Sequence, residues 1–162
     1  MTTFLIFLHV VAAILLLGPV VVSTSMFPRQ VAESRAGGEE ATGRASVLYR
    51  ITKTYGMLSL LVPLLGGAVL ASDWETYKAN YWFHTAIVLS VIAWAILLGM
   101  VIPQQRKMMG SLNALDPAKA DPSVYTANFE SAKAKATAGA GIFNLLVMII
   151  LILMYLPSDI FA

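Results

Sequence analysis

The chain has 162 residues, of which 58% are hydrophobic and 12% are charged, and its formal net charge is +2. This composition fits one membrane domain and leaves no separate basic surface for binding a nucleic acid. There is no cysteine, which excludes disulfides, thiolate metal sites and covalent c-type haem attachment.

The positive charges are confined to two parts of the chain. Ten of the eleven Lys and Arg residues lie in the segments Arg29–Lys53 and Arg106–Lys135, and Lys78 is the exception. Four apolar stretches separate and flank these segments. Three of them have about 20 residues, the length that crosses a ~30 Å hydrocarbon layer, and the second is shorter and reaches that length only if its helix begins near Tyr49 or Lys53. Because Lys and Arg are enriched in cytoplasmic loops, both basic segments are expected inside the cell and both termini outside.

The sequence therefore predicts an all-α protein, an integral membrane four-helix bundle with helical cytoplasmic extensions. It forms a single transmembrane domain over residues 1–162. The predicted spans are residues 4–26, 54–71, 81–102 and 137–156, and the predicted cytoplasmic loops are residues 27–53 and 103–136.

The first apolar stretch is interpreted as a retained span. A signal peptide has a basic segment before a short apolar region, whereas here the first basic residue, Arg29, follows the apolar stretch. Gly18-Pro19 lies in the inner half of this span, where proline removes a helix hydrogen bond and bends the axis. Pro28 is expected to close the helix.

The next two spans carry prolines and an aromatic cluster. The helical spacing of apolar residues after Thr42 predicts an amphipathic helix that approaches the second span along the membrane surface. Pro63 is expected to kink the second span, and Pro103 is expected to end the third. An aromatic cluster typical of a membrane interface opens the third span. The predicted interface anchors are Trp74, Tyr77, Tyr81 and Trp82.

The segment before the fourth span contains two helix-start patterns. In Asp116-Pro117 and Asp121-Pro122, the aspartate is suited to an N-cap and the proline to the first turn. The alanine-rich stretch from Pro122 to Lys135 has no helix breaker. It predicts that the fourth span continues into the cytoplasm as one long helix.

Small residues four positions apart let membrane helices approach closely, and polar residues can hydrogen-bond between them. Asn144 is the polar residue expected to bond across the bundle. The predicted helix-packing pairs are Gly67 with Ala71, Ala95 with Gly99, and Ala136 with Ala140.

His9 and His84 are the two ionisable residues predicted inside the spans, and burial of such a group in a membrane is costly enough to suggest a function. Both are expected in the outer half of the bilayer, where they could face one another. Two neutral imidazoles at one depth can ligate a haem b iron, bind copper or relay a proton. Alternatively, each hydrogen-bonds a neighbouring helix or lies in the headgroup layer. No catalytic residue and no other metal site is predicted.

The motif Phe7-Leu8-His9-Val10-Val11, followed by Gly18 and by Pro28-Arg29, resembles a broad group of small bacterial integral membrane proteins. This group includes the copper-resistance D-like family and the oxygen-independent protoporphyrinogen oxidase family, which also has a histidine early in its first span. Where that oxidase family opens its third span with a lysine, this chain carries His84. The resemblance implies haem-dependent chemistry.

In overall character the chain also looks like the small accessory subunits of actinobacterial respiratory assemblies, in which a cytochrome bc complex and cytochrome oxidase form a supercomplex. That resemblance implies a non-catalytic accessory or assembly subunit without a cofactor in a bacterial cytoplasmic membrane. Its partners would be lipids and other membrane subunits, including cytochrome bc and oxidase subunits. The alternatives are a small haem-binding oxidoreductase that uses His9 and His84, and a copper-handling membrane protein.

Overall fold

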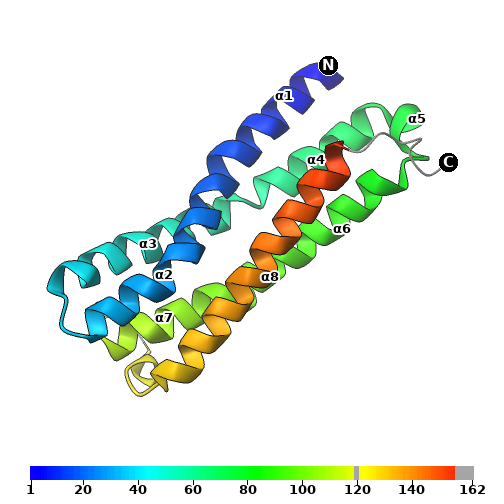
Figure 1. The fold of residues 1–162 in the computed structure, drawn as a ribbon. Helices are drawn as coiled ribbons and strands as arrows, with labels where there is room; N and C mark the ends of the chain where they lie inside the picture. Colours follow the sequence, from blue (N-terminus) through cyan, green and yellow to red (C-terminus); the bar gives the residue numbers. More distant parts are fainter. Residues whose placement is uncertain (119–120, 156–162) are drawn as a thin grey trace.

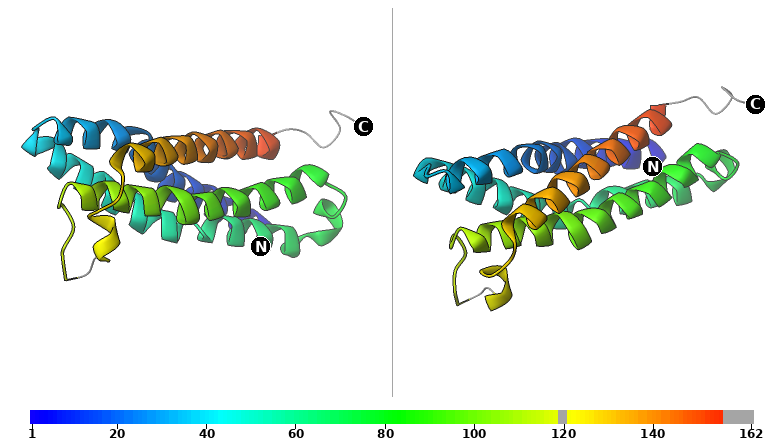
Figure 2. Two further views of the ribbon diagram at one scale, coloured as in Figure 1. Left: turned by 90° about the horizontal axis from the view of Figure 1, so that it is seen from below. Right: turned by 60° about the horizontal axis from the view of Figure 1, so that its bottom comes forward.

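A computed structural model describes residues 1–118 and 121–155, and every regular element in this part of the chain is a helix. Within it, four helical segments are long and apolar enough to cross a membrane: Thr2–Arg35, Glu39–Ser72, Tyr81–Ser111 and Phe129–Tyr155. They pack side by side as a bundle joined by turns (Figures 1 and 2). The predicted all-α four-helix fold is confirmed. The predicted end of the fourth span at residue 156 lies outside the described residues.

The first segment consists of α1 (Thr2–Ala12), a π-helical turn (Ala13–Leu17) and α2 (Gly18–Arg35). The prediction that Pro28 closes this helix was wrong, because α2 continues beyond it to its end at Arg35. Proline cannot donate its backbone hydrogen bond. Here Phe27 and Val31 on either side of it are fully buried in the core, and this packing holds the helix together.

The second segment consists of α3 (Glu39–Leu58) and α4 (Leu61–Ser72). Helix α3 lies antiparallel along α2 (Figure 1) and buries small residues of one face, so it belongs to the bundle. The expectation that it approaches along the membrane surface was wrong. The helix is interrupted between Leu58 and Leu61, where the Ser59 carbonyl accepts from the Val62 amide at 3.0 Å; in a regular helix it would accept from residue 63. Pro63 has no amide hydrogen to donate.

The short helix α5 (Trp74–Tyr77) lies in the turn after α4, and the third segment consists of α6 (Tyr81–Ile96), a π-helical turn (Leu97–Val101) and α7 (Ile102–Ser111). The prediction that Pro103 ends this helix was wrong. Proline clashes with the carbonyl four residues before it, which for Pro103 is the carbonyl of Gly99. That residue lies inside the wider π-helical turn, where the ring is accommodated and the helix continues.

The fourth segment is α8 (Phe129–Tyr155), preceded by a 3₁₀ turn at Pro122–Val124. The prediction of one continuous helix from Pro122 was wrong. Asp121 does act as a cap, since its carboxylate accepts from the Ser123 amide at 2.8 Å. Hydrogen bonds from Ser123 lower the pKa of Asp121. However, Asn128 accepts from the Ser131 amide at 2.9 Å, and this second cap starts α8.

The core is concentrated toward the middle of the bundle and toward the end that holds the α2–α3 and α7–α8 connections. In α1 no residue is buried, and in α4 only Val62 is. The other half of the bundle therefore consists of two helix pairs, α1 with α4 and α6 with α8, that pack only weakly against each other. The cluster at the connection end comprises Phe27, Val31, Ala45, Met108, Met109, Phe129, Ala132 and Ala136. The central cluster comprises Val20, Ala93, Leu97, Val101 and Phe143.

Candidate functional site

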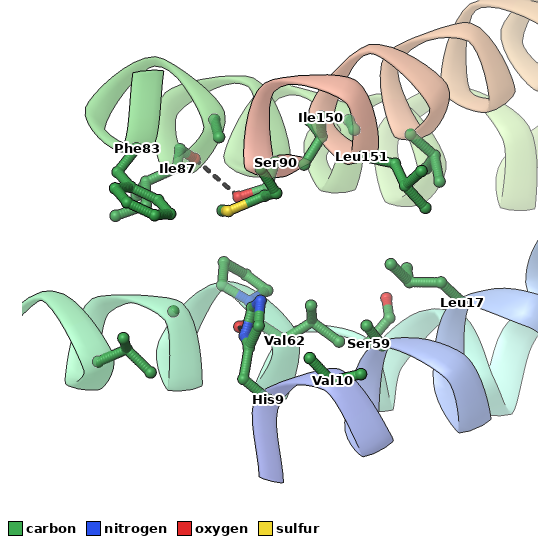
Figure 3. A pocket seen from close by; sticks show the side chains of 18 of the residues that line it. His9, Val10, Leu17, Ser59, Val62, Phe83, Ile87, Ser90, Ile150 and Leu151 are labelled. Carbon is green, nitrogen blue, oxygen red and sulfur yellow. Dashed lines mark hydrogen bonds between the residues drawn. The ribbon is translucent and has the colours of Figure 1, made fainter. Parts of the chain in front are cut away.

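His9 of α1 points across the bundle toward α4 (Figure 3). Its Nδ1 lies 3.0 Å from the carbonyl oxygen of Val62. A carbonyl can only accept, so Nδ1 carries the hydrogen and donates it. Gly66 permits this approach, since a Cβ at that position would lie 3.2 Å from His9 Cε1. His9 Nε2 makes no hydrogen bond to the residues that the structure describes. In a neutral imidazole it is therefore an available acceptor or metal ligand.

His84 lies near the N-terminal end of α6 among aromatic side chains. Its Nδ1 donates to the carbonyl of Asn80 at 2.9 Å, within the same turn of chain. The ring meets Trp74 edge-on, with centroids 6.2 Å apart. The Asn80 side chain caps α6 by accepting from the Trp82 amide at 3.1 Å. His84 is thus part of the helix start.

The structure gives the two histidines different surroundings. His9 lines a cavity between the helix pairs, and His84 is not among the described residues that line it. Within the described ranges, no three His, Asp or Glu side chains gather closely enough to hold a metal ion. Shared ligation of a haem or copper by His9 and His84 stays a prediction.

The cavity lies between α1 and α4 on one side and α6 and α8 on the other (Figure 3). It has a volume of about 500 Å³, is partly open, and is overwhelmingly apolar. Phe83, Ile87 and Ser90 project from α6 toward His9, and Ile150 and Leu151 project from α8 (Figure 3). With the expected orientation, this cavity lies in the outer half of the bilayer.

The predicted packing residues of α8 lie inside the bundle. Ala136 and Ala140 are buried. Between them, Gly139 lies so close to its neighbours that a Cβ would be 3.1 Å from Val101 Cγ2. Asn144 bonds across to α2, where its Nδ2 donates to Ser25 Oγ at 2.9 Å.

The other predicted packing pairs lie at the surface of the chain. Ala71, Ala95 and Gly99 are exposed and Gly67 is partly buried. A Cβ at Gly67 or at Gly99 would have no atom within 4 Å. These small residues are not used in packing between the helices of this chain.

The predicted interface anchors gather in α5 and at the start of α6. Trp74 and Tyr81 are exposed, whereas Tyr77 and Trp82 are partly buried. Tyr77 packs edge-on against Phe83, with ring centroids 5.0 Å apart.

Sequence reasoning missed several contacts that build this region. Trp94 Nε1 donates to the carbonyl of Gly56 at 3.1 Å, and Ser23 bonds to Thr52 at 2.8 Å between α2 and α3. A tryptophan in the middle of a span was a usable signal, because its N–H needs a partner in lipid. Gly66 carried no signal, because its role depends on the position of His9.

Comparison of the chain with protein-family models, with characterised proteins and with solved structures finds no match.

Proposed function

We propose that this chain is a non-catalytic accessory or assembly subunit of a larger complex in a bacterial cytoplasmic membrane. The observation that carries the proposal is the use of polar side chains in the four long helical segments. Ser23 bonds to Thr52, Asn144 to Ser25 and Trp94 to the Gly56 carbonyl. These hydrogen bonds join helices to one another, as interhelical polar contacts do in membranes. Such an arrangement supports a structural role.

The small residues at the surface support contact with partner helices. Helix association in a membrane depends on close packing at small residues, because lipid is as apolar as the helices. Gly67 on α4 and Gly99 in the third segment have open space beside them. A transmembrane helix of another subunit fits against such a face.

The partners that we propose are respiratory, namely cytochrome bc and cytochrome oxidase subunits. The support for this finer proposal is the resemblance in overall character to small accessory subunits of such assemblies. In that setting the chain would bind lipids and neighbouring subunits and would carry no electrons itself.

Purification from the native membrane tests this proposal. The tagged chain is extracted in mild detergent and the co-eluting proteins are quantified by mass spectrometry. We expect stoichiometric membrane subunits, including cytochromes. Gly67→Leu should release them, while Gly43→Leu on the cytoplasmic α3 and His84→Ala should not. A Cβ at either glycine would have no atom within 4 Å, so both leucines begin in open space. A wild-type chain that elutes alone contradicts the proposal, and partners without cytochromes contradict its respiratory part.

A second candidate, a small haem-binding oxidoreductase, is favoured by the fixed imidazole of His9. Axial ligands of haem and other metals are commonly oriented by a hydrogen bond from the far ring nitrogen, and His9 Nδ1 makes such a bond to Val62. A haem absorption spectrum of the purified wild type that is lost in His9→Ala would support this function. Copper that persists through dialysis and depends on His9 would support the copper-handling alternative.

A further inference from the structure

The cavity beside His9 has the size and surroundings of a site for a lipid-soluble molecule. Its volume of about 500 Å³ falls within the roughly 300–1,000 Å³ of ligand pockets. It is lined on one side by α1 and α4 and on the other by α6 and α8 (Figure 3). Because the lining is overwhelmingly apolar, the body of a molecule that fills this space must be apolar.

The few polar groups of the cavity determine which polar group a bound molecule would need. Ser59 Oγ donates to the Gly56 carbonyl at 2.7 Å, and Ser90 Oγ donates to the Ile87 carbonyl at 2.8 Å. Trp94 Nε1 also donates within the protein. The hydrogens of these three groups are therefore in use, and the serine oxygens keep only acceptor capacity.

His9 also offers a hydrogen-bond acceptor to the cavity. Its Nδ1 hydrogen is given to Val62, and a neutral ring is favoured in hydrocarbon because a buried charge is costly. Nε2 is then an acceptor. Tyr77, in the outer turn, is the lining residue whose hydroxyl remains able to donate. Apart from Tyr77, the described lining residues thus offer hydrogen-bond acceptors to a ligand and no free donor.

We propose that this cavity binds a lipid-soluble hydroxyl compound, with the apolar body between the helix pairs and the hydroxyl donating to His9 Nε2. A hydroquinol or another lipophilic phenol and a long-chain alcohol share this chemistry. A quinone or an ether of the same body lacks the donor and leaves Nε2 unpaired. The cavity should therefore bind a ligand with a hydroxyl donor more tightly than a quinone or an ether of the same body. This proposal does not depend on the chain having partner subunits.

The test uses Trp94 as a reporter, because it lines the cavity. Of the three tryptophans, Trp74 and Trp82 are replaced by phenylalanine, and the protein is placed in lipid nanodiscs. The probes are 4-decylphenol and its methyl ether, which share a body but differ in the donor. We expect saturable changes in Trp94 fluorescence at about tenfold lower concentration for the phenol, the effect of roughly one well-formed hydrogen bond.

His9→Phe should remove the preference for the phenol, and His84→Phe, outside the cavity, should retain it. Gly66→Ala is a milder second variant. Its Cβ would lie 3.2 Å from His9 Cε1, so it should displace the ring and weaken the preference in a folded protein. A comparison of dodecanol with its methyl ether then distinguishes the two candidate ligands. Tighter binding of dodecanol than of its ether supports a lipid alcohol. A preference seen only between the phenol and its ether supports a hydroquinol.

Three results would overturn the proposal. The first is equal binding of phenol and ether, or a signal that grows without saturation. The second is a preference that survives His9→Phe. The third is a haem band in the purified wild type that disappears with His9→Phe, which would assign Nε2 to iron. None of these results bears on whether partner subunits co-elute, so this proposal and the accessory role fail separately.

Discussion

Gly110 lies against the backbone of the 3₁₀ turn, where a side chain has no room. A Cβ at this position would be 2.6 Å from the carbonyl oxygen of Val124, and backbone atoms cannot rotate away. We predict that Gly110→Ala destabilises the protein by about 1–3 kcal/mol, as overpacking of a filled core does. The measurement is the midpoint of thermal unfolding in mild detergent.

Gly43→Ala is the matched control for this change. Gly43 lies on the exposed face of α3, where an added methyl group would have no atom within 4 Å. Alanine is the better helix former by about 0.5–1 kcal/mol, so this variant should be as stable as the wild type or more stable. If both glycines tolerate alanine equally, the close approach of Gly110 to Val124 is disproved.

The hydrogen bond between Ser23 and Thr52 joins α2 to α3 at a buried position. Interhelical hydrogen bonds in membranes contribute on average about 0.6 kcal/mol and at most about 2 kcal/mol. We predict a coupling energy in this range from a double-mutant cycle of Ser23→Ala and Thr52→Val, measured by unfolding in detergent. Strictly additive effects of the two changes would show that the pair contributes no interaction.

At the scale of the helix, the prolines explain which parts of the fold could be predicted from the sequence. Four membrane-length apolar helices were predictable from length and charge, and the second segment is interrupted before Pro63, where a kink was expected. Pro28 and Pro103 did not end their helices. Whether a helix continues past proline depends on tertiary packing, such as the burial of Phe27, or on a π-helical turn before it. Neither feature is visible in local sequence.

The π-helical turn at Ala13–Leu17 sets the rotation of α1 relative to α2. A deletion of Ile14 should convert it to a regular helix and turn α1 by about 100°, the angle per residue of an α-helix. This rotation would carry His9 away from Val62. It would also separate Thr2 from Ser72, whose hydroxyls now lie 3.2 Å apart.

A disulfide reports this rotation, because the chain has no cysteine of its own. Thr2→Cys with Ser72→Cys should crosslink in the full-length chain, and the yield should fall several-fold in the deletion. Ile14→Ala in the same background keeps the chain length and should retain the crosslink. Undiminished crosslinking after the deletion would rule out this role of the turn.

At the scale of the whole molecule, the charge distribution predicts the orientation. Glu75 in the outer turn and Glu40 at the start of α3 both have exposed side chains, 79% and 92% accessible. We predict that Glu75→Cys reacts with a membrane-impermeant maleimide on intact cells, whereas Glu40→Cys reacts only after permeabilisation. The opposite labelling pattern would show that the topology is the reverse of the expected one.

The candidate site was predicted only in part. His9 was identified because an ionisable residue inside an apolar span is conspicuous. Its partner, the Val62 carbonyl, is a backbone group, and Gly66 matters only through its distance from the imidazole. The cavity is lined by residues of α1, α4, α6 and α8, which lie far apart in the sequence. Such features depend on contacts between distant residues, which no local pattern in the chain records.

The uneven packing of the bundle has a consequence for how the protein can change over evolutionary time. Buried residues are concentrated in the middle and at the end of the bundle that is expected in the cytoplasm, whereas α1 has none. Most apolar replacements on α1 therefore leave no void and cause no clash. Saturation mutagenesis should reveal a gradient of tolerance across the bilayer, strict near the cytoplasm and permissive toward the exterior. His9 should then be the exception in this half, a position at which few replacements are tolerated.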